Sequence, residues 1–317
     1  TILRRLECAL KPTKKEVVAA YENNPTLPPQ KLEKLAGFQF YNTSHYTLKE
    51  LQNEADKLAE NFINYIEGFS ANVQDIMKQL KLAEHIKTMD DGGCFLTVVK
   101  AFSELDLDPA TYDSIKMGYI FENLIGRFFQ NVDAGQYYTG RDIIKCLVSI
   151  LTSEGSDDIF EDHKVITVCD QACGTGGMLS VAENYLHKLN ADAELLAFGQ
   201  EINDQTFAIC KADMLIKGND ATQIRSGNTL SDDQFADQTF DYILSNPPFG
   251  REWKNEKTAV EKEAKLGFAG RFGAGLPAVG DGQMLFLETA ISKMKPTGSR
   301  VAIIHNGSPL FTGDAGS

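Results

Sequence analysis

From about residue 160 onward, short apolar segments alternate with segments of helical pattern, and this alternation limits the possible folds more than any other feature. The first apolar segment, 165–169, has the sequence Val-Ile-Thr-Val-Cys, which is typical of a strand buried on both faces of a sheet. Strands that alternate with helices form βαβ units, so we predict a parallel, doubly wound α/β sheet. Such sheets bind ligands at the carboxyl ends of their strands. The expected strands are 165–169, 195–198, a short one near 224, 240–244 and 301–304, and the expected helices are 177–188, 205–217 and 284–294.

The first part of the chain has helical periodicity instead. After the capping-box pattern Thr47-Leu48-Lys49-Glu50, apolar residues recur every three or four positions, which predicts one helix with an apolar face as far as Ile66. Further helices are expected at 70–80 and from about 113 to 129. Because 317 residues exceed the usual size of a single core, we predict two domains, an all-helical one over 1–112 and an α/β one over 113–317.

A glycine-rich turn follows the first expected strand and has the sequence DQACGTGG over 170–177. Glycines between a strand and a helix let the backbone approach a ligand and present N–H groups to it. A dinucleotide-binding turn would need glycine at position 179, where this chain has Leu179, and this excludes the oxidoreductase interpretation. The acidic Asp170 ahead of the glycines suits a cationic ligand better than a pyrophosphate.

Acidic and amide residues follow the next two strands. Glu201 is at the tip of the second strand, where a carboxylate can accept hydrogen bonds from both hydroxyls of a ribose. Asn228 and Asp232 come after the short strand near residue 224. They either reach the base of a nucleoside cofactor or are ordinary turn residues, and the pattern leaves both interpretations open.

The tetrapeptide Asn246-Pro247-Pro248-Phe249 directly follows the fourth expected strand. An aromatic or amide amine is a weak nucleophile because its lone pair is delocalised into the π system. The side-chain oxygen of Asn246 and the main-chain oxygen of Pro247 could each accept one of its N–H groups, and this would draw the nitrogen toward tetrahedral geometry. The prolines hold these acceptors rigidly because their φ angles are fixed. Phe249 offers a stacking face for a base that is turned out of a duplex.

Together these motifs resemble the amino-methylating class of S-adenosylmethionine-dependent methyltransferases. The segment GQYYTGRD, at 135–142, is similar to the segment that lines the cofactor pocket in modification (M) subunits of type I restriction–modification systems. The order of motifs also resembles theirs, as does the tail, where Asp281-Gly282 opens a helix and Leu310-Phe311 precedes a glycine-rich loop. The resemblance covers 115–317 well and the helical region loosely.

The resemblance implies a Rossmann-like methyltransferase core that transfers a methyl group from S-adenosyl-L-methionine to N6 of a flipped adenine in DNA. The catalytic motif would be Asn246, Pro247, Pro248 and Phe249. The cofactor would be bound by Gln136, Tyr137, Tyr138, Thr139, Gly140, Arg141, Asp170, Gly174, Thr175, Gly176, Gly177, Glu201 and Asn228. This chain has Gln171 and Gly140 where the family usually has proline, a departure that removes backbone stiffness rather than a chemical group.

The charge of the chain bears on its partners. The formal net charge is −13, whereas a protein that binds nucleic acid by itself normally has a basic excess. The resemblance accounts for this, because in type I systems a separate specificity (S) subunit chooses the sequence and two M subunits clamp double-stranded DNA. We expect the helical domain to hold a partner or to clamp DNA. Whether a restriction (R) subunit is a further partner stays open. The stretch 251–271, with six basic and four acidic residues, is either a loop that closes over DNA or a solvated loop.

Other features restrict the remaining possibilities. The six cysteines include no C-x-x-C pair and the five histidines are scattered, so no metal site is expected. No run of about 18 apolar residues occurs, so we expect no membrane span and a cytoplasmic location. The first residue, Thr1, and the small-residue end suggest a fragment cut at both ends, with the catalytic domain truncated at its C-terminus.

Three alternatives stay open at this point. A protein-glutamine N5-methyltransferase that acts on release factors uses N-P-P-Y, and Phe249 and the segment 136–139 count against it. An N4-cytosine methyltransferase shares the same chemistry. A chain without catalysis could instead serve as a scaffold that holds a specificity subunit through its helices.

Overall fold

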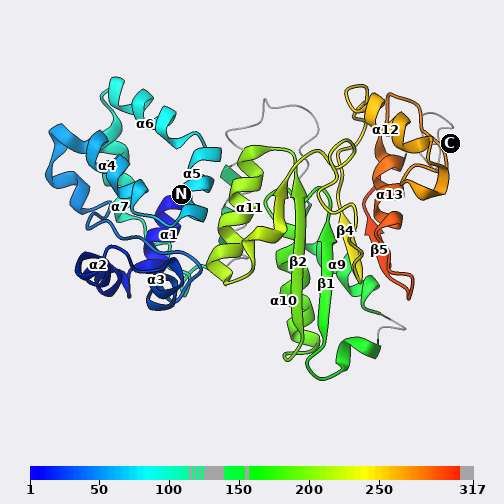
Figure 1. Ribbon diagram of the computed structural model, residues 1–317, viewed down its shortest axis with the longest axis horizontal. Helices are drawn as coiled ribbons and strands as arrows, with labels where there is room; N and C mark the ends of the chain where they lie inside the picture. Colours follow the sequence, from blue (N-terminus) through cyan, green and yellow to red (C-terminus); the bar gives the residue numbers. More distant parts are fainter. Residues whose placement is uncertain (114–115, 118, 121–122, 125–138, 154–156, 308–317) are drawn as a thin grey trace. The chain divides into compact units, whose positions relative to one another are not determined.

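The computed structural model describes residues 1–113, 116–117, 119–120, 123–124, 139–153 and 157–307. Within it the chain forms two compact units (Figure 1). The first consists of Thr1–Met117 and Ala208–Ala221, and the second of Gly118–Phe207 and Thr222–Ser317. Helix α11 (Asp204–Lys217) therefore begins in the second unit and continues into the first.

The first unit is helical over its described residues. Local signals account for the ends of α3, since Pro29 occupies its first turn, where a missing N–H costs nothing, and Gly37 ends it in the left-handed conformation at φ 74°. The Arg5 guanidinium is buried and donates to the Leu107 carbonyl at 2.8 Å, which ties α1 to the segment after α7. The elements of this unit are α1 (Ile2–Leu10), α2 (Lys14–Asn23), α3 (Pro29–Ala36), η1 (Glu50–Asn53), η2 (Ala55–Lys57), α4 (Leu58–Glu67), α5 (Ala71–Gln79), α6 (Leu82–Asp91) and α7 (Phe95–Glu104).

The single helix expected from Leu48 to Ile66 is wrong. The structure has two short 3-10 turns, η1 and η2, and only then the α-helix α4. The chain breaks at Glu54, where φ is −124° and ψ is 68°. The Leu48 N–H donates to the Glu7 carboxylate at 2.7 Å, and η1 packs against α4 and α7.

The second unit contains a five-stranded parallel sheet in the order β3-β2-β1-β4-β5. The expected strands are thus present, and the predicted doubly wound architecture is confirmed. The strand order reverses between β1 and β4, whose register pairs Val168 with Tyr242. The strands are β1 (Val165–Asp170), β2 (Glu194–Glu201), β3 (Ile224–Ser226), β4 (Tyr242–Ser245) and β5 (Arg300–Ile303). The helices are α9 (Arg141–Leu151), α10 (Gly177–Leu189), α12 (Lys257–Ala264) and α13 (Gln283–Ser292), with 3-10 turns η3 (Asp157–Phe160), η4 (Ala221–Gln223) and η5 (Gly267–Ala269).

Side chains on the strands alternate between two apolar layers, as the strand period requires. Helix α10 packs on β1 and β2, and α9 packs on α10 and β5 (Figure 1). A buried cluster that includes Cys169 and Ile243 of the sheet and Ala290 of α13 forms another layer. Its aromatic residues Phe235 and Phe240 meet edge to face, with ring centroids 6.0 Å apart.

The stretch 251–271, expected as a loop in both alternatives, contains the helix α12 and the 3-10 turn η5, although many of its side chains are exposed. Trp253 and Val260 within it and Phe272 next to it are buried with Leu230 and Leu285. These apolar side chains form a second, smaller core, which holds the segment between β4 and α13 in place.

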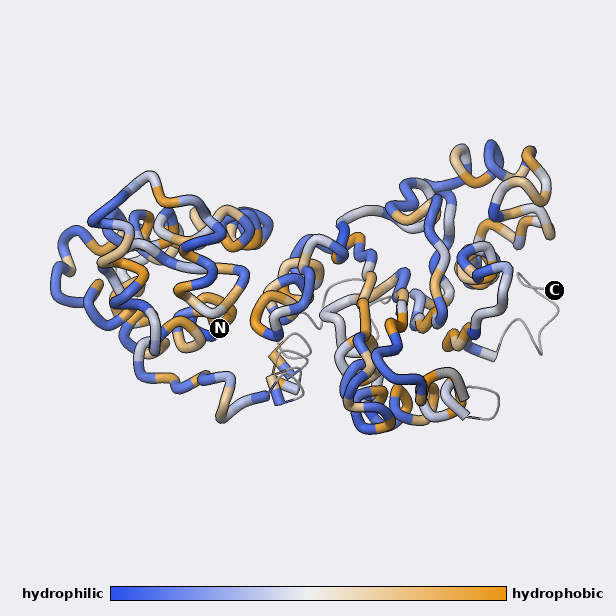
Figure 2. Tube along the Cα trace, turned by 60° about the horizontal axis from the view of Figure 1, so that its bottom comes forward, coloured by the Kyte–Doolittle hydropathy of each residue, from blue (hydrophilic) through white to orange (hydrophobic). Residues whose placement is uncertain are grey.

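No helix within the described ranges has both the length and the apolar character needed to cross a membrane. Figure 2 agrees with this result, because hydrophobic residues occur along the trace in short runs separated by hydrophilic ones.

We predict that Phe240→Ala destabilises the second unit strongly. The Phe240 ring is buried and contacts the Phe198 ring at a centroid distance of 4.9 Å. Its removal should lower the free energy of unfolding by about 3–5 kcal/mol, measured by urea denaturation. The control is Phe268→Ala, whose ring is 88% exposed. The control should change stability by less than about 0.5 kcal/mol, and equal effects of the two variants would contradict this account of the core.

Candidate active site

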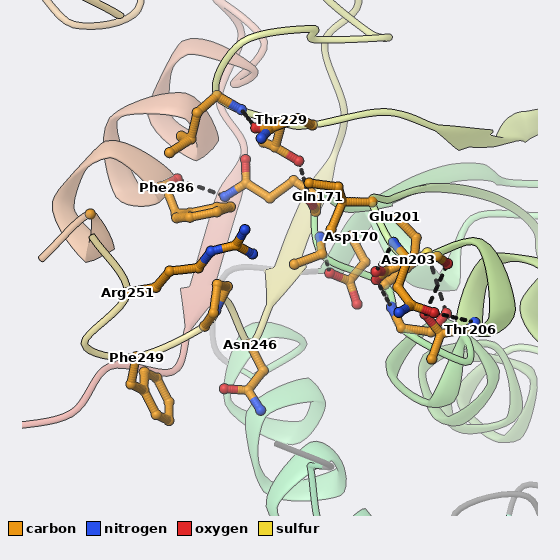
Figure 3. Close-up of a pocket in the computed structure, with 18 of the residues that line it drawn as sticks. Asp170, Gln171, Glu201, Asn203, Thr206, Thr229, Asn246, Phe249, Arg251 and Phe286 are labelled. Carbon is orange, nitrogen blue, oxygen red and sulfur yellow. Dashed lines mark hydrogen bonds between the residues drawn. The ribbon is translucent and has the colours of Figure 1, made fainter. Parts of the chain in front are cut away.

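A cavity of about 600 Å³ opens at the carboxyl ends of the strands. Its wall combines the ends of β1, β2 and β4 with the segment after β3, residues 250–253, Glu256 and α13 (Figure 3). This is the place where the strand order reverses, and open α/β sheets bind ligands at such a point. Figure 3 shows Asp170 between the Glu201 side of the cavity and the Asn246 side.

Asp170 ends β1 and is buried in the wall of the cavity. Its Oδ1 accepts hydrogen bonds from the Ala172 N–H at 3.0 Å and from the Ser245 hydroxyl at 3.1 Å. Burial raises the pKa of the carboxyl from its ordinary value of 3.8 to about 7, although both hydrogen bonds oppose the rise. The nearby Glu201 carboxylate adds to it. A cationic ligand would offset this desolvation penalty, because it stabilises the charged form of the Asp170 carboxylate.

Glu201 ends β2, and its carboxylate joins two turns. Oε2 accepts the Gly174 N–H and Oε1 accepts the Asn203 N–H, both at 2.8 Å. Burial raises the pKa of this carboxyl above its usual range, against the effect of these hydrogen bonds. Asn203 also caps α11, since its Oδ1 accepts the Thr206 N–H at 3.1 Å. The turn is therefore held in a fixed shape around the carboxylate.

The glycine-rich turn supplies open backbone on the other side of Glu201. Gly174 has a φ of 53°, and no atom lies within 4 Å of the place where a Cβ would be. Gly176 is the N-cap residue of α10 and is also left-handed, at φ 82°. Gly174, Thr175 and Gly177 line the cavity, whereas Gly176 shapes the turn that places them.

Asn246 follows β4, and a hydrogen bond holds its side-chain amide in one orientation. Its Nδ2 donates to the Thr139 hydroxyl at 2.8 Å, which places Oδ1 on the other side of the amide. Pro248 and Phe249 line the cavity with it, and Pro247 is buried. Figure 3 shows Phe249 on the same side of the cavity as Asn246. The structure thus brings three of the four residues of the expected catalytic motif, Asn246, Pro248 and Phe249, to the cavity, whereas Pro247 is not among its described lining residues.

The structure describes only residues 139–141 of the segment 136–141. Gln136, Tyr137 and Tyr138 lie outside the described residues. Thr139 lines the cavity, Gly140 is the N-cap residue of α9, and the buried Arg141 lies over the Tyr119 ring, 4.5 Å from its centroid. Only Thr139 of these described residues lies in the cavity wall.

The wall that faces the sheet comes from the 251–271 region, which sequence reasoning did not assign to the site. Asn228 lines the cavity as expected, and its Nδ2 donates to Glu256 Oε1 at 2.7 Å. Asp232 is not among the described residues of the lining. Arg251, Trp253 and Glu256 do line the cavity. No sequence signal identifies them, because their place depends on how the segment packs.

Gln171 shows how the chain accommodates its departure from proline. Its side chain is buried, and Nε2 donates to the Phe286 carbonyl at 2.6 Å, so it links the turn to α13. The Thr229 hydroxyl donates to the Gln171 carbonyl. These contacts across the cavity restrain the turn where a proline ring would otherwise have stiffened it.

Within the described residues, no three or more His, Cys, Asp or Glu side chains come close enough together to hold a metal ion.

We predict that Asp170 makes the stability of the protein depend on pH. The folded state keeps its proton up to about pH 7, whereas an unfolded chain loses it near pH 3.8. The folded pKa is the higher one, so the favourable contribution is present below pH 3.8 and is lost as the pH rises through 7. The free energy of unfolding of wild type minus that of Asp170→Asn should therefore fall between pH 4 and pH 8 in urea titrations. The exposed Asp192→Asn is the control, and a difference that rises with pH would contradict the assignment.

Two curated relatives are methylase subunits of type I restriction enzymes. The type I restriction enzyme MjaIX methylase subunit of Methanocaldococcus jannaschii is 26% identical over 214 residues, which cover 66% of this chain and 36% of that protein. The HindI methylase subunit of Haemophilus influenzae is 27% identical over 198 residues, which cover 61% of this chain and 40% of that protein. The chain thus spans 36% to 40% of the length of these two relatives.

Solved structures show the fold. A type I restriction–modification system methyltransferase subunit from Streptococcus thermophilus superimposes with a TM-score of 0.71 at 19% identity, over 99% of this chain and 70% of that chain. A putative class I S-adenosylmethionine-dependent methyltransferase from Listeria monocytogenes gives a TM-score of 0.51 at 18% identity, over 84% of this chain and 76% of that chain. The predicted Rossmann-like methyltransferase core is confirmed as a fold.

Two family models match. The model described as the HsdM N-terminal domain covers residues 1–102, and the model described as N-6 DNA Methylase covers residues 113–317. The second match extends over more than half of the chain and includes the whole cavity. The chain therefore belongs to the N-6 DNA Methylase family, which confirms the resemblance drawn from its motifs.

Proposed function

We propose that this chain is part of the modification subunit of a type I restriction–modification system. In this proposal it transfers a methyl group from S-adenosyl-L-methionine to N6 of a flipped adenine in double-stranded DNA. The observation that carries the proposal is the Asn246 amide, oriented by Thr139 in the wall of a cavity that Asp170 and Glu201 also line.

The cavity fits the proposed cofactor. Its volume of about 600 Å³ lies in the range of small-molecule sites. Asp170 suits the cationic methionine part, and Glu201 suits the ribose hydroxyls. Glu201 accepts the Gly174 N–H on Oε2 and the Asn203 N–H on Oε1, and these hydrogen bonds hold the carboxylate in the cavity wall. The empty space at the Gly174 Cβ position lets a ligand approach the backbone. The cofactor would supply an electrophilic methyl group on a sulfonium centre.

Residues of this chain would activate the adenine amino group as a nucleophile. Asn246 Oδ1 and the Pro247 carbonyl would each accept one N–H of the adenine amino group and aim its nitrogen lone pair into the cavity. The Thr139 hydroxyl supports this role, because its hydrogen bond with Asn246 Nδ2 holds the amide in one orientation. Phe249 would stack on the flipped base. The nitrogen gains the methyl group and loses one proton.

The proposal extends to partners. With a net charge of −13, this chain would rely on a specificity subunit and a second modification subunit for much of its hold on DNA. We propose that the helical domain, 1–112, contacts these partners and that 113–317 is catalytic. The curated relatives are methylase subunits of type I restriction enzymes, which supports this assignment. A restriction subunit would be a further partner.

We predict that Asn246→Ala abolishes methylation and leaves cofactor affinity within a few-fold, because Asn246 would contact the base rather than the cofactor. The measurement is a map of N6-methyladenine in genomic DNA from cells with the native gene and with the variant, beside calorimetric binding of S-adenosylmethionine. The control is Asn255→Ala, since Asn255 is exposed and lies in the segment after the motif.

Loss of the methyl mark at one sequence in the Asn246→Ala cells alone would support the proposal and would also reveal the DNA target. Retained methylation would remove Asn246 from the mechanism. An unmethylated genome in the native cells would point to another substrate, and methylated glutamine would then be sought by mass spectrometry.

We predict that Glu201→Ala weakens cofactor binding by about 1.5–3 kcal/mol, because two hydrogen bonds to a charged group are lost. Calorimetry with S-adenosylmethionine measures the change. Glu194→Ala removes an exposed carboxylate at the opposite end of the same strand and should bind normally. Equal affinities of wild type and Glu201→Ala would show that the ribose is bound elsewhere.

A further inference from the structure

Two large apolar side chains stand exposed at η5, the 3-10 turn within the 251–271 segment. The Phe268 side chain is 88% exposed and that of Leu266 is 61% exposed. Single exposed apolar residues are common on protein surfaces. This pair is different because it occupies one tip, while Val260 and Phe272 on either side of it are buried.

The backbone of this tip is fixed in place. Gly267 has a φ of 59°, a conformation that favours glycine. A Cβ on Gly270 would lie 2.8 Å from the Glu263 carbonyl oxygen, and a Cβ on Gly273 would lie 2.5 Å from the Gly267 backbone. Close packing of the chain on itself therefore holds Phe268 outward, in a tip that does not depend on its own apolar side chains for support.

Arg271 connects the tip to the candidate active site. Its Nε donates to Glu263 Oε1 at 2.8 Å, and Nη2 donates to Glu263 Oε2 at 2.6 Å, a bidentate pair that closes the base of the tip. Its guanidinium also donates to the carbonyls of Thr229 and Leu230, at 2.6 and 3.1 Å. Both of these residues line the cavity. The Cα atom of Phe268 lies within about 11 Å of that of Arg271, because the two residues are only three positions apart in the chain.

The charge around the tip favours nucleic acid. The stretch 251–271 has six basic and four acidic residues, in a chain whose net charge is −13. Lys262 and Lys265 are both exposed and lie four positions and one position before Leu266. Exposed apolar side chains beside basic ones match a wedge that enters a base step while cations bind the phosphates.

We infer that the tip with Leu266 and Phe268 is a DNA wedge that enters the duplex at the base step that the target adenine leaves. The inference rests on the proposed function and deepens it, because it names the element that pushes the adenine out of the stack. Arg271 links the wedge to Thr229 and Leu230 of the cavity wall, so the two belong to one structural piece.

The test uses the full-length protein assembled with its partner subunits and a duplex that carries the methylated sequence mapped in the genome. Two duplexes are compared, one with the target adenine paired to thymine and one with an abasic site opposite it. Phe268→Ala should methylate the paired duplex at least about tenfold more slowly, because the cost of unpairing is no longer offset. On the abasic duplex its rate should return to within about twofold of wild type, since extrusion there costs little.

Two measurements separate a wedge from a merely structural role. A 2-aminopurine at the target position should brighten less with Phe268→Ala than with wild type, while the affinity for S-adenosylmethionine stays the same. Ile150→Ala is the matched control, because Ile150 is as exposed as Leu266, at 61%, and lies on α9. It should behave as wild type on both duplexes.

Three outcomes would overturn the inference. A wild-type rate of Phe268→Ala on the paired duplex would show that the ring does not take part. Failure of this variant to assemble with its partner subunits would assign the tip to a protein interface instead. A wild-type complex that methylates neither duplex would overturn the proposed function itself, and the inference with it.

Discussion

A hydrogen bond from the Ser245 hydroxyl to Asp170 joins the two central strands at the point where the strand order reverses. Both residues are buried, so the carboxylate is desolvated and its pKa rises to about 7. The chain turns away from this point in opposite directions after β1 and β4, and the cavity opens between the two turns. The other groups of the candidate site are placed relative to this pair.

A second set of contacts closes the cavity from the far side. Asn228, after β3, is bound to Glu256, and Arg271 binds the carbonyls of the residues that follow Asn228. The segment between β4 and α13 thus builds the cavity wall and also carries the exposed tip at Phe268. One buried core under Trp253 stabilises both parts. The binding of a small molecule and contact with a large substrate would therefore involve the same structural element.

Much of the second unit could be predicted from local sequence. The strand 165–169, the glycine turn and Glu201 were expected where the structure has them, because strand hydrophobicity and glycine conformation are properties of a few adjacent residues. The helix predicted from Leu48 was wrong, since the chain forms two 3-10 turns with a break at Glu54 before α4 begins. The expected site role of Asp232 finds no support in the described lining of the cavity.

The sequence by itself determined the α/β alternation, the family and the residues at the strand ends, since each of these follows from the order of residue types along the chain. Only the tertiary structure decided that Thr139 orients Asn246, that Glu256 meets Asn228, and that Gln171 reaches α13. Each of these contacts joins residues 28 to 115 positions apart. Such pairs form through packing of distant segments, which leaves no periodic signal in the sequence.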